Sequence, residues 1–429
     1  MVKRKIKDII IKNELYPREK INQDKVKEYE QYIGVLPPIT INQDNILIDG
    51  FHRYFAYKNT NQQEIDVVLD KTKDDDDLFL RSIELNAQHG LPLTQKEKRN
   101  LVISMYQKTI DNKDLSYDVR RLKTVFSIPD STFSDWTKNL NDELESQRLE
   151  KILNLHLQCI TQQQIADEIG LAIGSISEKL KKINEFINNY SEITDSELLE
   201  KNAFLTEKLQ YISEFKPFLY NIWNVSSINN EYKHFGNFPI EFMENLLYYY
   251  TKPFDVVYDP FAGGGVTIDA CKKWMRKYYV SDIKPIDIRN DIKQWKIQDG
   301  IPKELLKPDF VFLDPPYWQQ AKNEYSDSID DIGNMMLEQF YETISFLIKE
   351  IKKKMTSGYV AFVISATQKA ERIDHAITIN SLFEKNKFEL VERIILPYST
   401  QQYNGNQVIN AKENKKMLNL YRDLIIYGI

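Results

Sequence analysis

The chain has 429 residues, and 42% of them are hydrophobic, so we expect two or three domains with cores of their own. The formal net charge of −6 excludes a passive nucleic-acid coat but not an enzyme with a local basic face. The two cysteines, Cys159 and Cys271, exclude a disulfide framework and a cysteine zinc site, and they favour a reducing compartment. Without a signal segment or a long apolar stretch, the sequence predicts a cytoplasmic protein with no membrane span.

Residues 1–92 are predicted to form a small α/β module. The expected elements are a strand at 6–11, a helix at 22–32 and strands at 38–42 and 46–49. The run Asp49-Gly50-Phe51-His52-Arg53 then enters a helix. His52 and Arg53 in the first turn predict an anion site, because their donors and the helix dipole act together. In the alternative interpretation Arg53 pairs with a nearby carboxylate and His52 is structural.

Residues 93–214 are predicted to be helical and to contain two candidate helix-turn-helix motifs. The first covers residues 119–136. In the second, Thr161 caps the helix Gln162–Ile169, Gly170 makes the turn, and a second helix begins near Ser175. Lys179 and Lys182 are the candidate phosphate contacts, and an ordinary helical hairpin is the alternative. From residue 178 to about 209 the pattern predicts one connector helix.

Two motifs mark residues 215–429 as an α/β domain. The first, Asp259-Pro260-Phe261-Ala262-Gly263-Gly264-Gly265, lies between an apolar run at 254–258 and a helical pattern at 266–271. This placement predicts a strand-to-helix turn whose glycines let a ligand approach the backbone. Further strands are expected at 278–280, 286–288, 310–313 and 359–364, with a reversed pair at 389–395 and 424–427.

The second motif, Asp314-Pro315-Pro316-Tyr317, follows the apolar run at 310–313 and should lie where open α/β sheets bind ligands. The two prolines lack N–H groups, so carbonyl oxygens remain available as acceptors. An acid, a carbonyl and the flat face of Tyr317 suit the amino group of a base removed from its stack.

With both motifs, the chain resembles the amino-group DNA methyltransferases, whose cofactor loop is FxGxG and whose catalytic motif is (D/N/S)PP(Y/F/W). The resemblance implies a Rossmann-like domain, S-adenosylmethionine as cofactor, double-stranded DNA as substrate and no metal. It favours adenine N6, because the catalytic motif begins with Asp, over cytosine N4. Asp314, Pro315, Pro316 and Tyr317 are the expected catalytic residues. The expected cofactor residues are Asp259, Phe261, Ala262, Gly263, Gly265, Asp282 at the ribose and Asp291 at the adenine, with Asp299 competing for the adenine.

The N-terminal module resembles ParB-like and sulfiredoxin-like domains through Asp49, Gly50, His52, Arg53 and Ala56. This resemblance implies a nucleotide-phosphate or nucleic-acid contact over residues 5–105. It supports an alternative function, a DNA-binding partition or regulatory protein with a subsidiary methylase domain. RNA or protein as substrate, a nucleotide at the module and a dimer are left open. The polar stretches 319–335 and 397–416 suit substrate-side loops, but they are short for a full recognition domain.

Overall fold

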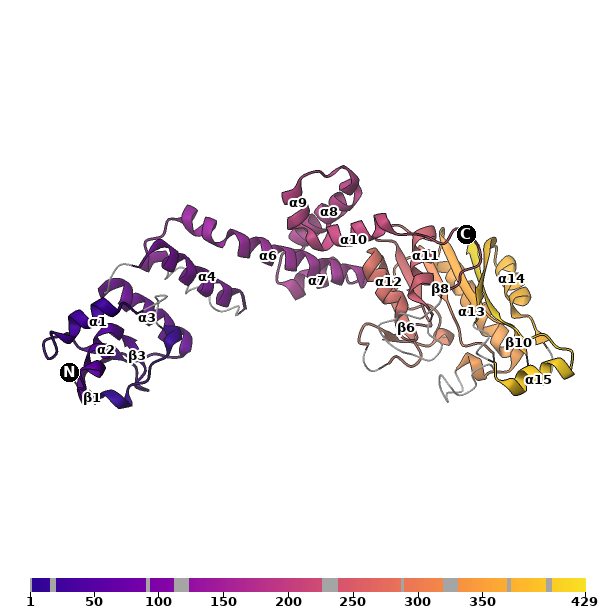
Figure 1. The fold of residues 1–429 in the computed structure, drawn as a ribbon. Helices are drawn as coiled ribbons and strands as arrows, with labels where there is room; N and C mark the ends of the chain where they lie inside the picture. The colour runs from indigo at the N-terminus through magenta and orange to yellow at the C-terminus, as the bar shows by residue number, and fades with distance from the viewer. Residues whose placement is uncertain are drawn as a thin grey trace. The chain divides into compact units, whose positions relative to one another are not determined.

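A computed structural model describes residues 2–15, 21–89, 93–111, 123–225, 238–286, 289–318, 331–368, 372–398 and 403–429. The chain divides into two compact units, Met1–Glu145 and Ser146–Ile429 (Figure 1). The division falls within the long helix α6 (Asp130–Leu157), so the helices that follow it belong to the same unit as the C-terminal sheet. The predicted three-part division at 92 and 214 stays a prediction. No helix among the described residues is long and apolar enough to cross a membrane.

The first unit contains a four-stranded sheet with the order β1-β4-β2-β3, in which β2 and β4 are parallel and the other pairs antiparallel. Its elements are β1 (Val2–Lys5), α1 (Gln23–Glu30), β2 (Ile39–Ile41), β3 (Leu47–Asp49), α2 (Phe51–Asn59), β4 (Glu64–Leu69) and α3 (Asp75–His89). The predicted strand at 6–11 is wrong. Residues 6–8 form a 3₁₀ helix, because Ile6 and Ile9 are both buried and a spacing of three suits a turn, not a strand.

Helix α4 (Gln95–Asp111) begins at a capping box, where Glu97 N donates to Thr94 Oγ1 and Thr94 N donates to Glu97 Oε2. Of the first helix-turn-helix candidate, residues 119–122 lie outside the described part of the chain. Residues 131–136 belong to α6, which has 28 residues. This helix begins at Asp130, where the sequence predicted the start of a recognition helix, and its role in recognition stays a prediction.

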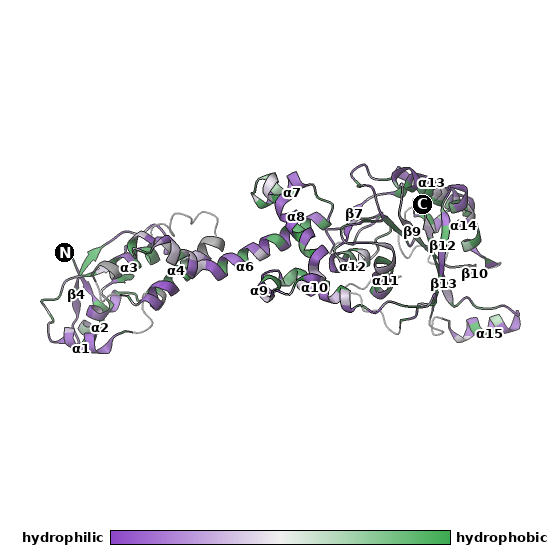
Figure 2. Cartoon of the chain, turned by 90° about the horizontal axis from the view of Figure 1, so that it is seen from above, coloured by the Kyte–Doolittle hydropathy of each residue, from purple (hydrophilic) through white to green (hydrophobic). Residues whose placement is uncertain are grey.

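The second helical hairpin is confirmed as α7 (Gln162–Ile169) and α8 (Ile173–Asn189). Thr161 and Gln164 form a capping box, and Gly170 makes the turn with a φ of 74°. The single connector helix is wrong. The chain turns at residues 190–192 and restarts as α9 (Ser196–Lys201) and α10 (Ala203–Glu214), because Asp195 caps a new helix. Helices α8 and α10 alternate between hydrophilic and hydrophobic residues along their length (Figure 2).

The second unit is built on a seven-stranded sheet with the order β12-β13-β9-β8-β5-β6-β7. The strands are β5 (Val256–Asp259), β6 (Lys277–Asp282), β7 (Lys293–Gln294), β8 (Phe310–Leu313), β9 (Tyr359–Ile364), β12 (Glu389–Pro397) and β13 (Tyr421–Gly428). Strand β13 runs antiparallel to both of its neighbours, β12 and β9, and the remaining strand pairs of this sheet are parallel. This topology confirms the Rossmann-like α/β class. The strand expected at 286–288 falls largely on residues outside the described part of the chain.

The sheet is covered on both faces by helices, as a mostly parallel sheet requires. One face packs against α11 (Ile240–Tyr250) and α12 (Val266–Trp274), and the same hydrophobic core continues from these helices into α10, α8 and α7. The other face packs against α13 (Leu337–Lys354) and α14 (His375–Lys385). Alternate residues of β8 face the two cores, with Phe310 and Phe312 on one side and Val311 and Leu313 on the other. This packing fixes the carboxyl ends of β5, β6 and β8 beside one another.

Candidate active site

The predicted glycine loop connects β5 to α12 and lies against the end of β6. Gly263 has a φ of 51° and Gly265, which caps α12, has a φ of 84°. Ala262 N donates to Ser281 O at 3.0 Å, and Gly263 N donates to Asp282 Oδ2 at 3.0 Å. The strand-turn-helix placement of the loop is therefore confirmed, and its two left-handed positions explain the need for glycine.

Asp259 is enclosed by the loop that it begins, with an exposed fraction of 1%. Its Oδ1 accepts from Phe261 N at 2.9 Å, and its Oδ2 accepts from Thr267 Oγ1 at 2.5 Å. Burial raises the pKa of Asp259 to about 7, against the opposing effect of these two hydrogen bonds. Asp259 therefore stabilises the turn of the glycine loop from the buried side.

Asp282 ends β6, where the sequence places a ribose contact. Its Oδ2 accepts from Gly263 N, and its Oδ1 accepts from Lys284 N at 3.0 Å. These contacts orient the Asp282 carboxylate beside the glycine loop, and its role as the ribose contact stays a prediction. The half-buried carboxylate and the glycine backbone beside it form a donor and acceptor set that fits a nucleoside.

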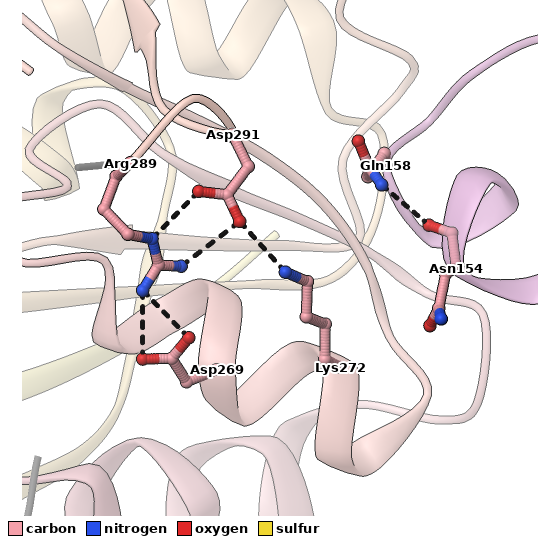
Figure 3. Close-up of polar contacts among 6 residues, drawn as sticks. All are labelled: Asn154, Gln158, Asp269, Lys272, Arg289 and Asp291. Atoms are coloured by element: carbon pink, nitrogen blue, oxygen red, sulfur yellow. Dashed lines mark hydrogen bonds and ion pairs between the residues drawn. The ribbon is translucent and has the colours of Figure 1, made fainter. Parts of the chain in front are cut away.

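Asp291 lies in a network of charges that the sequence did not predict (Figure 3). Arg289 Nε donates to Asp291 Oδ1 at 2.9 Å, and Lys272 Nζ pairs with Asp291 Oδ2 at 3.0 Å. Arg289 also pairs with Asp269 at 3.0 Å. Although burial acts to raise the pKa of Asp291, the bonds from Arg289 and Lys272 lower it below its ordinary value. Both carboxylate oxygens are thus engaged by cations, and the assignment of Asp291 to the adenine ring stays a prediction.

Arg289 also packs against the glycine loop. A Cβ atom on Gly265 would lie 2.9 Å from the guanidinium carbon of Arg289. Gly265 is therefore required for two reasons, its left-handed backbone and the close approach of a buried cation.

The second motif lies at the end of β8, next to β5. The Tyr317 hydroxyl donates to Asp314 Oδ1 at 3.0 Å. Burial raises the pKa of the half-buried Asp314 to about 6, while Arg422 and the bond from Tyr317 act to lower it. From the sequence, only the aromatic face of Tyr317 was predicted to have a role in the site. The structure adds a hydroxyl contact to the acid, and it adds Arg422, for which the sequence carried no signal.

A buried chain of hydrogen bonds fixes the backbone that follows Tyr317. Thr367 Oγ1 donates to Trp318 O at 3.0 Å, and its oxygen contacts His375 Nε2 at 2.8 Å. Because the Thr367 proton is used, His375 Nε2 must be the donor, and Nδ1 accepts from the Tyr341 hydroxyl at 2.8 Å. Burial lowers the pKa of His375 to about 4, in agreement with a neutral ring.

In the first unit, the side chains predicted to bind an anion have partners within the unit. Arg53 pairs with Asp49 at 2.7 Å and donates to the carbonyl oxygen of Pro38 at 2.7 Å. His52 Nε2 accepts from Asn22 N at 3.2 Å. These contacts agree with the structural alternative, in which Arg53 pairs with a carboxylate.

The lysines of α8 belong to a surface of mixed charge. Lys182 pairs with Glu178 at 2.8 Å, Lys181 pairs with Glu185 at 3.6 Å, and Lys179 is half-buried. Contact of Lys179 and Lys182 with phosphates stays a prediction.

A sequence profile of the DNA methylase family matches residues 7–290, a span that includes the glycine loop and ends before Asp314. The transcriptional regulator NovG of Streptomyces niveus is 36% identical over 66 residues, or 15% of this chain. The chain spans about a fifth of the length of that curated relative, since the match covers 20% of it.

Solved structures with partial similarity fall into two groups. A SAM-dependent methyltransferase from Archaeoglobus fulgidus is 16% identical, with 44% of this chain and 94% of that chain covered and a TM-score of 0.28. A precorrin-6y C5,15-methyltransferase from Geobacter metallireducens is 13% identical, with 44% and 86% covered and a TM-score of 0.28. The chromosome-partitioning protein ParB from Caulobacter crescentus, complexed to the parS site, is 13% identical, with 48% and 100% covered and a TM-score of 0.23.

The sheet order and the glycine loop define the class of the second unit, a Rossmann-like domain of the S-adenosylmethionine-dependent methyltransferases. The profile match covers more than half of the chain, so the chain belongs to the DNA methylase family. S-adenosylmethionine is its cofactor, and the glycine loop together with Asp282 fits that cofactor.

Proposed function

We propose that this protein transfers a methyl group from S-adenosylmethionine to the exocyclic amine of a flipped base in double-stranded DNA, at adenine N6. The observation that carries the proposal is the adjacency of the two motifs. Strands β5 and β8 pair in parallel through Val257 and Phe310, so the loop that follows β5 and the Asp314 motif that follows β8 lie at one edge of the sheet. Ligands of open α/β sheets bind at this edge.

The residues of the second motif supply what an amino group requires. The cofactor, when bound, supplies an activated methyl group. Asp314 and the carbonyl oxygen of Pro315 would accept hydrogen bonds from the two amino hydrogens, which makes the nitrogen lone pair available. Tyr317 orients the Asp314 carboxylate through its hydroxyl bond. Adenine N6 is favoured over cytosine N4 because the motif begins with Asp, in resemblance to adenine enzymes.

Mass analysis of the product tests this function. The purified chain would be incubated with unmethylated duplex DNA and isotopically labelled cofactor, and the DNA would be digested to nucleosides. We expect labelled N6-methyladenosine in its deoxy form. Label in N4-methylcytosine would correct the base, and label in RNA or protein supplied in parallel, with none in DNA, would overturn the substrate.

The activity should have an acidic limb governed by Asp314. The carboxylate must be ionised to accept an amino hydrogen, and burial raises its pKa to about 6. Below that pH we expect kcat/KM to fall about tenfold per pH unit, and above it we expect a plateau. Single-turnover assays between pH 5 and 8, with cofactor binding measured at each pH, give the profile. A flat profile across pH 6 would show that ionised Asp314 is not required.

The first unit should supply a share of the DNA affinity. A fragment that begins at Ser146 keeps α7, α8 and α10. Leu205 and Leu209 of α10 belong to the same hydrophobic core as the sheet. We expect this fragment to bind the cofactor like the full chain but to bind DNA more weakly and with a shallower dependence on salt, because fewer counterions are released. Fluorescence anisotropy at several salt concentrations tests this. Equal slopes for fragment and full chain would assign the first unit another role.

A further inference from the structure

Arg422 is a buried cation that neither motif explains. It lies near the start of β13, where it pairs in register with Leu396 of β12. The next residue, Asp423, points to the opposite face of the sheet and accepts from Arg393 Nε at 2.8 Å. Asp423 is therefore not the partner of Arg422. The side chain of Arg422 lies on the other face of β13 and extends toward the end of β8.

The guanidinium of Arg422 is held between two aromatic rings. Its central carbon lies 5.6 Å from the ring centroid of Phe238 and 5.3 Å from that of Tyr398. Tyr398 is placed by the strand pair, since Tyr398 N donates to Leu420 O at 2.7 Å. Among the described residues, no hydrogen-bond acceptor contacts the buried Nε atom of Arg422. A buried charge with an unused donor is costly, so its retention points to a role in a site.

Charged and titratable groups from four elements bear on Asp314. Arg422 comes from β13 and Tyr317 from the motif itself. Tyr398 follows β12 and also interacts with Arg422, and Asp259 ends β5 and interacts with Asp314. Burial raises the pKa of Tyr398, so the ring stays neutral. Arg422 is then the cation in this described group that offsets the burial of the Asp314 carboxylate.

We propose that Arg422 is a positioning residue of the methyl-transfer site, which holds Asp314 as an anion and keeps Tyr317 bonded to it. The inference rests on the proposed function, because an ionised acceptor matters only if Asp314 meets an amino group. Phe238 and Tyr398 fix the cation at this position. The free Nε–H would bind an acceptor of the incoming base next to its amine, such as a ring nitrogen.

Three full-length variants test the role. Arg422→Met removes the charge at similar length, Arg422→Lys keeps it, and Arg393→Met removes a cation of the neighbouring strand that pairs with Asp423 on the other face. We expect the acidic limb of kcat/KM to move upward by about one pH unit in Arg422→Met, with an approximately fivefold loss at pH 6 that recovers at pH 9. Arg422→Lys should keep the limb within half of that shift, and Arg393→Met should leave it unchanged.

A direct titration separates this inference from the proposed function. Carbon-13 NMR of carboxyl-labelled aspartate, with Asp314 assigned through Asp314→Asn, reports the ionisation of Asp314 without any turnover. A higher titration midpoint in Arg422→Met than in the wild type supports the inference, and equal midpoints overturn it. If Arg422→Met does not fold, Arg422→Gln removes the charge in its place, and a raised Asp314 midpoint in this variant supports the inference whereas a midpoint equal to that of the wild type overturns it. Failure of the wild type to methylate DNA while the midpoints differ would overturn only the proposed function.

Discussion

Asp314→Ala is expected to abolish most DNA methylation while leaving the affinity for S-adenosylmethionine largely unchanged. Asp314 follows β8, where it meets the Tyr317 hydroxyl at 3.0 Å, whereas the loop residues that fit the cofactor follow β5 and β6. Loss of one charge-assisted hydrogen bond in a dry site costs about 3 kcal/mol of transition-state stabilisation, or roughly a hundredfold in rate. Single-turnover methylation and calorimetric titration of the cofactor measure the two quantities.

Two further variants separate the charge of Asp314 from its shape. Asp314→Asn keeps the size of the side chain but removes the anion, so we expect a loss close to that of the alanine variant. Tyr317→Phe removes the hydroxyl bond and keeps the aromatic face, so its loss should be smaller, about tenfold. An Asp314→Asn variant with near wild-type turnover would remove Asp314 from the catalytic assignment.

Gly265→Val is expected to weaken cofactor binding by at least about a hundredfold and to lower the melting temperature of the second unit. The φ of 84° at this position is strained for a β-branched residue, and the new Cβ would lie 2.9 Å from the Arg289 guanidinium. Strain of this kind costs roughly 1–3 kcal/mol, and displacement of Arg289 from Asp269 and Asp291 adds to it. Calorimetric titration and thermal unfolding measure the two effects.

Gly174→Val is the matched control for this substitution. Gly174 lies in the first turn of α8, where no heavy atom comes within 4 Å of an added Cβ. Its φ is not in the left-handed region, and valine has a slightly higher helix propensity than glycine, so the free energy of unfolding should change by less than about 1 kcal/mol. If Gly265→Val bound the cofactor as tightly as Gly174→Val, the glycine loop would be a structural turn and not part of the cofactor site.

Local patterns in the sequence determined the elements that carry both motifs. The uninterrupted apolar runs at 310–313 and 359–364 became β8 and β9, since buried parallel strands are hydrophobic on both faces. The strand-to-helix turn at Gly263 and Gly265 and the helix capped by Thr161 depend only on residues close in sequence. Such features can be predicted because backbone strain and capping hydrogen bonds are short-range.

Only the tertiary structure decided which side chains surround the acids of these motifs. Asp291 follows the strand predicted at 286–288, as a cofactor residue would, yet in the structure Arg289 and Lys272 engage its carboxylate. Arg422 lies far from Asp314 in sequence, and the reversal of β13 between β9 and β12 brings it to the end of β8. Sheet order and side-chain direction set these contacts. Both arise from packing between distant segments, which no local pattern of residues encodes.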